Sequence, residues 1–186
     1  MSGHSVLVAG VGNIFLGDDG FGVEVVRRLA GRPLPETVKV ADFGIRGVHL
    51  AYELLDGYDT TILVDAMPHG ETPGTVSVLE LDPNEVGTES AGDTAVALAP
   101  DDGLGAPVLD AHGMTPDQVF GLLRRLGGHP RRVLVVGCEP ADITDRMGLS
   151  EPVAAAVDAA VEAVFDLANK EAAVAADGTS QEGGTR

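Results

Sequence analysis

The chain has a single cysteine, no tryptophan and no long apolar run, and each shortage excludes a class of protein. Cys138 alone cannot form an intramolecular disulfide, nor a zinc ribbon or iron–sulfur cage built from several cysteines. No uninterrupted apolar stretch approaches about 18 residues, so we expect no membrane-spanning segment. The first residues, MSGHSVLV, lack the basic and apolar regions of a secretory signal, which predicts a cytoplasmic protein.

Basic residues are also scarce, with 12 Lys and Arg against 29 Asp and Glu, giving a net charge of −17. Such a chain is poorly suited to neutralise phosphates, so neither nucleic acid nor an anionic membrane surface is an expected partner. Residues 80–110 carry eight acidic residues and no Lys or Arg. We interpret this run as a solvated loop rather than a cation-binding surface.

Five short stretches have the β-branched, apolar character of buried strands: residues 5–9, 38–42, 61–65, 75–81 and 132–136. Helical patterns lie between most of them. This alternation predicts a single α/β domain whose twisted, mostly parallel five-stranded sheet is sandwiched by helices, as in phosphorylase- and hydrolase-like folds.

The helices have recognisable apolar faces and start signals. Residues 21–29 and 50–55 each carry an apolar stripe, and the last helix is expected to begin at Ser150. Thr115, Pro116 and Gln118 form a capping-box pattern at the start of a third helix. We predict that residues 1–168 form the domain and that residues 169–186, which are poor in large apolar side chains, form a disordered tail.

The loop GVGNIFLGDD after the first predicted strand resembles a dinucleotide-binding loop only superficially. The third glycine of that fingerprint is replaced by Phe15, and no Walker A lysine is present. Asp18 and Asp19 just before a helix would repel a pyrophosphate, although either could cap the helix. The hypothesis of a nucleotide-binding enzyme is therefore supported by Gly10 and Gly12 alone.

Polar residues follow several predicted strands, where an open parallel sheet binds its ligands. Asp19, Asp65 and His112 could meet at that edge, and two carboxylates with one imidazole would suit a divalent cation. HExxH and GxSxG motifs are absent, so neither a thermolysin-like zinc site nor a serine hydrolase elbow is predicted. We interpret Cys138, at the end of a buried strand, as a small core residue.

Four segments resemble the hydrogenase maturation endopeptidases. They are GVGNIFLGDDGFGVEVVRRL at 10–29, DFGIRGVHLAYELL at 42–55, ILVDAMPHGETPGTV at 62–76, and the DAHGMTP and VGCEP segments around His112 and Cys138. The resemblance extends in order over residues 6–167, apart from much of the acidic connection. The pattern GxGNxxxxDDGxG is the most specific part, because neither class of nucleotide-binding loop contains it.

This resemblance implies an aspartyl- or metal-dependent peptidase, acting as a monomer, that trims the C-terminal extension from a [NiFe]-hydrogenase large-subunit precursor. It implies that Asp19, Asp65 and His112 bind nickel, and that the precursor supplies this nickel. Asp19 and Asp65 would be the catalytic residues, with Asp18 the alternative to Asp19. Asp65 could instead act as a general base while nickel serves only for recognition. Arg46, in the GIRG segment, would pair with a carboxylate of the precursor or order the site.

A non-enzymatic nickel carrier remains the alternative function. The acid-rich edge and the acidic run at 80–110 would suit it. A carrier should bind free nickel tightly, whereas the peptidase should require the precursor.

Overall fold

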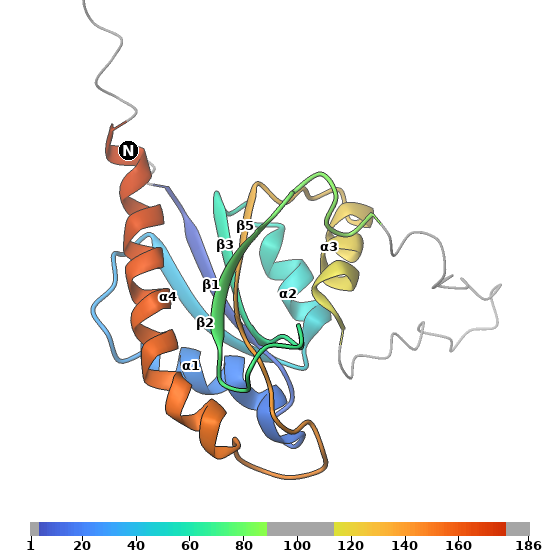
Figure 1. Cartoon of the computed structure of the whole chain (residues 1–186). Coiled ribbons are helices and arrows are strands. Elements are labelled where there is room, and N and C mark those ends of the chain that lie inside the picture. Colours follow the sequence, from blue (N-terminus) through green and yellow to red (C-terminus); the bar gives the residue numbers. More distant parts are fainter. Residues whose placement is uncertain (1–3, 89–113, 178–186) are drawn as a thin grey trace, which may run out of the picture.

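The computed structural model describes residues 4–88 and 114–177 and has a five-stranded sheet between two layers of helices (Figure 1). The strand order is β2-β1-β3-β5-β4. Four strands are parallel: β1 (Val6–Val11), β2 (Val38–Gly44), β3 (Thr60–Ala66) and β5 (Arg132–Cys138). The edge strand β4 (Val76–Leu81) pairs antiparallel with β5. The predicted α/β class and mostly parallel sheet are therefore confirmed.

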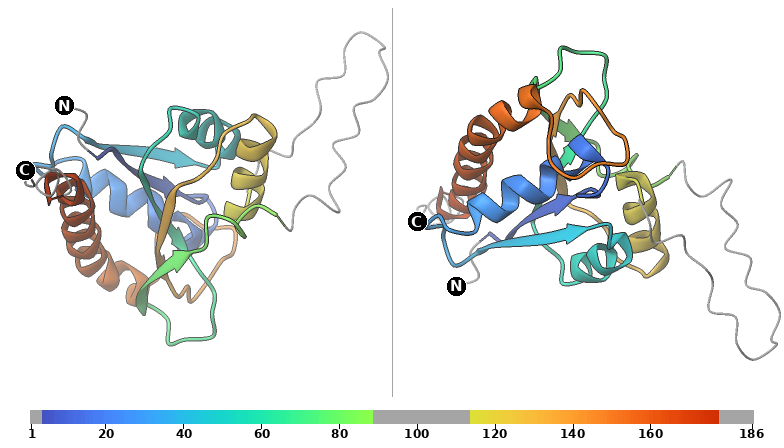
Figure 2. Two further views of the ribbon diagram at one scale, coloured as in Figure 1. Left: turned by 90° about the horizontal axis from the view of Figure 1, so that it is seen from above. Right: turned by 90° about the horizontal axis from the view of Figure 1, so that it is seen from below.

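Helices cover both faces of the sheet (Figure 2), and each face has its own apolar core. One core lies under α1 (Phe21–Leu29) and α4 (Glu151–Asp177), and the other lies under α2 (Gly47–Leu54) and α3 (Pro116–Arg125). Both faces of the central strands are thus shielded from water, which explains their continuous Val, Leu and Ile runs. In the part of the chain that the structure describes, no helix is both long and apolar enough to span a bilayer.

The predicted start of α3 is confirmed at the level of individual atoms. The backbone N–H of Gln118 donates to Thr115 Oγ1 at 3.4 Å, and the backbone N–H of Thr115 donates to Gln118 Oε1 at 2.9 Å. Pro116 occupies the first turn, where a missing N–H costs nothing. This reciprocal capping fixes the helix that follows the segment containing His112, which itself lies outside the described residues.

The prediction of a disordered tail from residue 169 is wrong for its first half, because α4 continues to Asp177. Alanine-rich sequence extends an existing helix readily, since alanine has the highest helix propensity and no new nucleus is needed. Glu171 is buried on this extension, where it accepts a hydrogen bond from Thr60 Oγ1 at 3.1 Å and lies 3.5 Å from Arg132 Nε. A helical segment poor in large apolar residues can therefore still pack against the sheet through a buried polar contact. Residues 178–186 lie outside the described part.

The start of α1 lies against the backbone of the sheet. A Cβ atom on Gly22 would lie 2.0 Å from the carbonyl oxygen of Val64 in β3 and 2.5 Å from that of Val11 in β1. A Cβ atom on Gly10 would likewise lie 2.5 Å from the carbonyl oxygen of Gly22. Glycine therefore permits a close helix–sheet approach here, the role that the third glycine has in dinucleotide folds.

We expect Gly22→Ala to lower the free energy of unfolding by about 3 kcal/mol, because its methyl group would overlap two carbonyl oxygens that belong to the sheet. Chemical denaturation would measure this loss. Gly31→Ala is the matched control, since the nearest atom to its added Cβ would be 3.8 Å away. Equal stability of the two variants would contradict the close approach.

Candidate functional site

The carboxyl ends of the four parallel strands lie at one edge of the sheet, at the bottom of Figure 1. Asp65 lies near the end of β3, paired in register with Gly137 of β5. Asp19 lies in a short 3-10 helix, η1 (Gly17–Gly20), between β1 and α1. The two carboxylates are close enough for the charge of Asp19 to act on Asp65. The structure thus brings two of the three predicted site residues together.

Asp19 is oriented by the loop that precedes it. The backbone N–H of Asn13 donates to Asp19 Oδ2 at 2.6 Å. Gly12 has a φ of +121°, and a Cβ atom there would lie 1.8 Å from the carbonyl oxygen of Asp19. A side chain at position 12 would therefore be both strained and obstructed. In the GVGN loop a backbone N–H, that of Asn13, therefore binds the carboxylate of Asp19, and the loop does not serve as a phosphate-binding site.

At this edge of the sheet, the pKa of Asp65 departs furthest from its ordinary value. It is partly exposed, yet protein encloses most of its surroundings. Burial, and after it the charge of Asp19, raises the pKa of Asp65 to about 7, although the hydrogen bond from the backbone N–H of Ala66 opposes the shift. Near neutral pH this carboxyl group can therefore take up or release a proton. A cation placed between the two carboxylates would relieve their repulsion.

Asp18, the neighbour of Asp19, is fully buried and has a structural role. It accepts hydrogen bonds from the backbone N–H groups of Ala141 (2.8 Å), Asp142 (2.9 Å) and Ser150 (2.6 Å), and from Ser150 Oγ at 2.8 Å. Burial alone would raise the pKa of Asp18, but these hydrogen bonds outweigh it and lower that pKa. Its oxygens are occupied, so Asp18 is not the alternative ligand. Neither aspartate caps α1, because Gly20 is the N-cap residue and no side chain bonds there.

Glu139 was not assigned a role from the sequence, yet it organises the segment that follows Asp65. Its Oε2 accepts hydrogen bonds from the backbone N–H groups of His69 at 2.7 Å and Glu71 at 3.2 Å. These backbone hydrogen bonds, His69 first, lower the pKa of Glu139. The one sign of this role in the sequence is that Glu139 is an acidic residue directly after a buried strand. Its partners could not be inferred without knowing that β5 lies beside β3.

Arg46 lies at the same edge but bonds to its own strand. Its Nε donates to the carbonyl oxygen of Phe43 at 3.1 Å, and its terminal nitrogen donates to the carbonyl oxygen of Asp42. The N–H of Gly12 donates to the carbonyl oxygen of Gly44 at 3.1 Å, which joins the end of β2 to the GVGN loop. Arg46 therefore orders the end of β2, and its exposed side chain leaves the predicted pairing with a precursor carboxylate untested.

The third predicted ligand, His112, lies outside the described residues, so its position relative to Asp19 and Asp65 stays a prediction. Among residues 4–88 and 114–177, no group of three His, Cys, Asp or Glu side chains is arranged to hold a metal ion. Cys138 is buried at the end of β5, and burial raises the pKa of its thiol to about 11. The interpretation of Cys138 as a core residue is confirmed, because a buried thiol with this pKa is a poor nucleophile.

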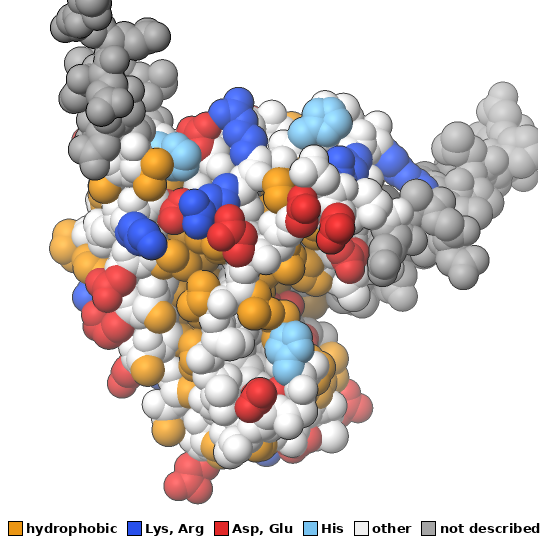
Figure 3. All heavy atoms as spheres, turned by 45° about the horizontal axis from the view of Figure 1, so that its top comes forward, with side chains coloured by type: hydrophobic (Ala, Val, Ile, Leu, Met, Phe, Trp, Pro, Cys, Tyr) orange, Lys and Arg blue, Asp and Glu red, His pale blue; other side chains and the backbone are white. Residues whose placement is uncertain are grey.

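Charges at the other end of the sheet contrast with this carboxylate pair. Figure 3 turns the amino-terminal ends of the parallel strands toward the viewer and shows acidic and basic side chains close together. Arg132 lies 3.3 Å from Glu80, Lys39 lies 2.5 Å from Glu53, and Arg131 is paired with Asp59. Opposite charges therefore neutralise one another there, whereas like charges meet at the carboxyl edge.

Comparisons with known proteins agree with the geometry. Residues 23–91 and 101–167 match the sequence profile of a family described as hydrogenase maturation protease. A Methanocaldococcus jannaschii protein that carries the same description is 34% identical over 89% of this chain and 97% of its own length. The hydrogenase expression/formation protein HupD of Rhizobium leguminosarum bv. viciae is 32% identical over 84% of this chain and 70% of its own.

Solved structures give the same result. The hydrogenase maturating endopeptidase HybD from E. coli superposes with a TM-score of 0.66 and 28% identity, covering 89% of this chain and 93% of that one. A hydrogenase 2 maturation peptidase from Thaumarchaeota archaeon SCGC_AB-539-E09 gives a TM-score of 0.62 and 31% identity, covering 88% and 97%. The similarity to these two solved structures thus extends over 88–89% of this chain.

We expect Asp18→Asn to lower the free energy of unfolding at pH 7 by about 3 kcal/mol, because the amide cannot accept all four hydrogen bonds. The lowered pKa of Asp18 means that its contribution is present at neutral pH and is lost on acidification through that pKa. Denaturant unfolding at pH 7 and pH 3 would measure both effects. The exposed Asp145→Asn on the same loop is the control, and an equal loss in both variants would contradict the structural role.

The raised pKa of Asp65 predicts the opposite pH dependence. Between about pH 4 and pH 7 the folded state holds a proton on Asp65 that the unfolded chain releases, so stability falls as pH rises through this window. Relative to Asp65→Asn, the wild type should lose up to about 4 kcal/mol across it. Unfolding free energies of both proteins at several pH values would measure this. Asp19→Asn should lower the pKa of Asp65, and parallel pH profiles for wild type and Asp65→Asn would contradict the assignment.

Proposed function

The chain belongs to the hydrogenase maturation protease family, and from this we propose that it removes the C-terminal extension of a [NiFe]-hydrogenase large-subunit precursor after nickel insertion. Members of this family are peptidases that act on hydrogenase large-subunit precursors. The proposal adds that nickel, carried by the precursor, is the feature recognised here. Nickel thus arrives as part of the substrate and is not a resident cofactor.

The observation that carries this proposal is the pair of like-charged carboxylates at the carboxyl edge of the sheet. Asp19 and Asp65 come from segments far apart in the sequence, and burial, followed by the charge of Asp19, raises the pKa of Asp65. Repulsion between two neighbouring carboxylates raises the free energy of the folded protein unless a cation or a shared proton is present. Carboxylate oxygens suit a divalent metal, so a nickel ion presented by the precursor would be attracted to this edge.

In the proposed complex, Asp19 and Asp65 would bind nickel held by the precursor, with His112 as the third ligand. Such an attachment would position the scissile peptide bond next to the carboxylates, and positioning alone lowers an activation barrier substantially. A precursor without nickel would lack the attachment point. Cleavage would therefore follow metal insertion and would not precede it.

The second possibility within the same function assigns the proton chemistry to Asp65. A general base is most effective when its pKa is close to the working pH, and the pKa of Asp65 is raised to about 7. Asp65 would then accept a proton from the attacking water, while nickel would serve only for recognition. The hydrogen bond from the N–H of Asn13 would keep Asp19 oriented in both cases.

The decisive experiment is the intact mass of a nickel-loaded large-subunit precursor after incubation with this protein. We expect loss of one C-terminal peptide from the nickel-loaded precursor, no loss from the nickel-free precursor, and a rate at least about 100-fold lower with Asp65→Asn. Asp56→Asn, which removes one acidic charge from an exposed position between α2 and β3, should cleave normally.

An unchanged mass with the organism's own nickel-loaded precursor would contradict the peptidase proposal. Titration of the protein alone with nickel would then test the carrier, which should bind free nickel tightly. Cleavage of nickel-free precursor at the same rate would contradict nickel recognition while leaving the peptidase intact.

A further inference from the structure

Two loops beside the site expose large apolar side chains. Phe15, in the loop between β1 and α1, is 60% exposed, while Ile143 and Met147, between β5 and α4, are 44% and 70% exposed. Scattered single apolar residues on a surface need no explanation, but several on two adjoining loops mark an interaction site. We call these two loops, residues 13–20 and 141–150, the loop platform.

The loop platform is held as one unit. Leu16 and Arg146 form a parallel bridge, in which the N–H of Arg146 donates to the carbonyl oxygen of Phe15 at 3.0 Å and the N–H of Gly17 donates to that of Arg146 at 2.8 Å. The buried carboxylate of Asp18 adds three backbone hydrogen bonds to residues 141, 142 and 150. The apolar side chains are therefore displayed from an ordered surface, which lowers the entropic cost of binding.

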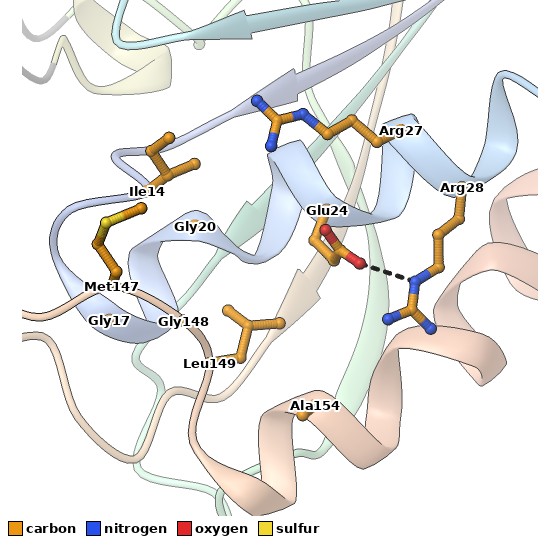
Figure 4. Close-up of a pocket in the computed structure, with 10 residues that line it drawn as sticks. All are labelled: Ile14, Gly17, Gly20, Glu24, Arg27, Arg28, Met147, Gly148, Leu149 and Ala154. Carbon is orange, nitrogen blue, oxygen red and sulfur yellow. Dashed lines mark hydrogen bonds and ion pairs between the residues drawn. The ribbon is translucent and has the colours of Figure 1, made fainter.

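A pocket of about 330 Å³ opens between the loop platform, α1 and the first turn of α4 (Figure 4). Its apolar wall is formed by Ile14, Met147, Leu149 and Ala154. This volume lies at the lower end of the range for binding pockets, about 300–1,000 Å³. It suits one or two apolar side chains of a bound segment.

The pocket and the proposed active site share the short helix η1. Gly17 and Gly20, the two ends of η1, line the pocket, and Asp19 lies between them in the same short helix. A precursor whose scissile bond lies at Asp19 therefore also lies close to η1 and to the pocket that Gly17 and Gly20 line.

The charges around the pocket are balanced, in contrast to the net charge of −17 of the whole chain. Arg28 Nε lies 2.8 Å from Glu24 Oε1, and Arg146 lies 3.3 Å from Asp142. Arg27 also lines the pocket, 3.4 Å from Asp42. An apolar segment can approach this surface without unbalanced charge, which matches the polar rim of a protein interface around an apolar centre.

We propose that the loop platform and its pocket are the docking surface for the hydrogenase large-subunit precursor, which seats an apolar side chain in the pocket. This inference rests on the proposed function and adds a second recognition element, independent of nickel. Docking would supply affinity through apolar contact, whereas Asp19 and Asp65 act on the metal-bearing end. Loss of the docking contacts would weaken binding without changing the chemical step.

The test compares the double variant Phe15→Ser/Met147→Ser with wild type in cleavage of nickel-loaded precursor. Both side chains are exposed, so the fold should be unaffected. We expect KM to rise about tenfold with kcat unchanged, because removal of central apolar contacts commonly costs this much. The control is Tyr52→Ser/Val78→Ser, which removes two similarly exposed apolar side chains from α2 and β4 and should leave KM unchanged.

Binding measured without cleavage separates docking from the proposed function. The uncut complex of nickel-loaded precursor with Asp65→Asn gives a Kd, which should rise about tenfold when Phe15→Ser/Met147→Ser is added. If wild type does not cleave, the proposed function fails, and this Kd still decides the docking surface. An unchanged Kd, an equal rise in the control variant, or a fall in kcat at constant KM would each overturn the inference.

Discussion

The contact between the start of α1 and the backbone of the sheet is the constraint on which the site depends. Because Gly22 has no side chain, the helix lies against the carbonyl oxygens of Val64 and Val11. The short helix η1 must then turn directly over the strand ends. This geometry brings Asp19 to Asp65, and it would be lost if α1 were pushed outward by a single methyl group.

The adjacent residues Asp18 and Asp19 have different environments because the loop turns their side chains in different directions. Asp18 points inward and is satisfied by four hydrogen bonds, which lower its pKa. Asp19 remains at the edge, where its charge adds to the effect of burial in raising the pKa of Asp65. The same type of side chain therefore fixes the loop platform at position 18 and places a carboxylate beside Asp65 at position 19. Each depends on the other, since the orientation of η1 follows from the anchoring of Asp18.

The fold could be predicted from sequence because its signals are local. Short β-branched, apolar runs identified all five strands, and Thr115 with Gln118 identified the start of α3. Asp19 and Asp65 could be selected because parallel strands end at one edge. The burial of Asp18 and the contacts of Glu139 depend on residues more than 65 positions away in the chain, so no local pattern reports them. The extension of α4 was missed because one buried glutamate replaced the expected apolar stripe.

Helix α4 is tied to the sheet at both of its ends, and this has a mechanical consequence. Ser150, just before its first turn, bonds to Asp18 at the carboxyl edge, and Glu171, near its far end, bonds to Thr60 at the amino-terminal edge. The helix therefore acts as a brace across the full height of the sheet. Opening of its last turns would release one anchor, and residues 141–150 would lose stiffness even though they lie at the opposite edge. The C-terminal part of α4, which is poor in large apolar residues, thus helps to keep the carboxyl edge of the sheet rigid.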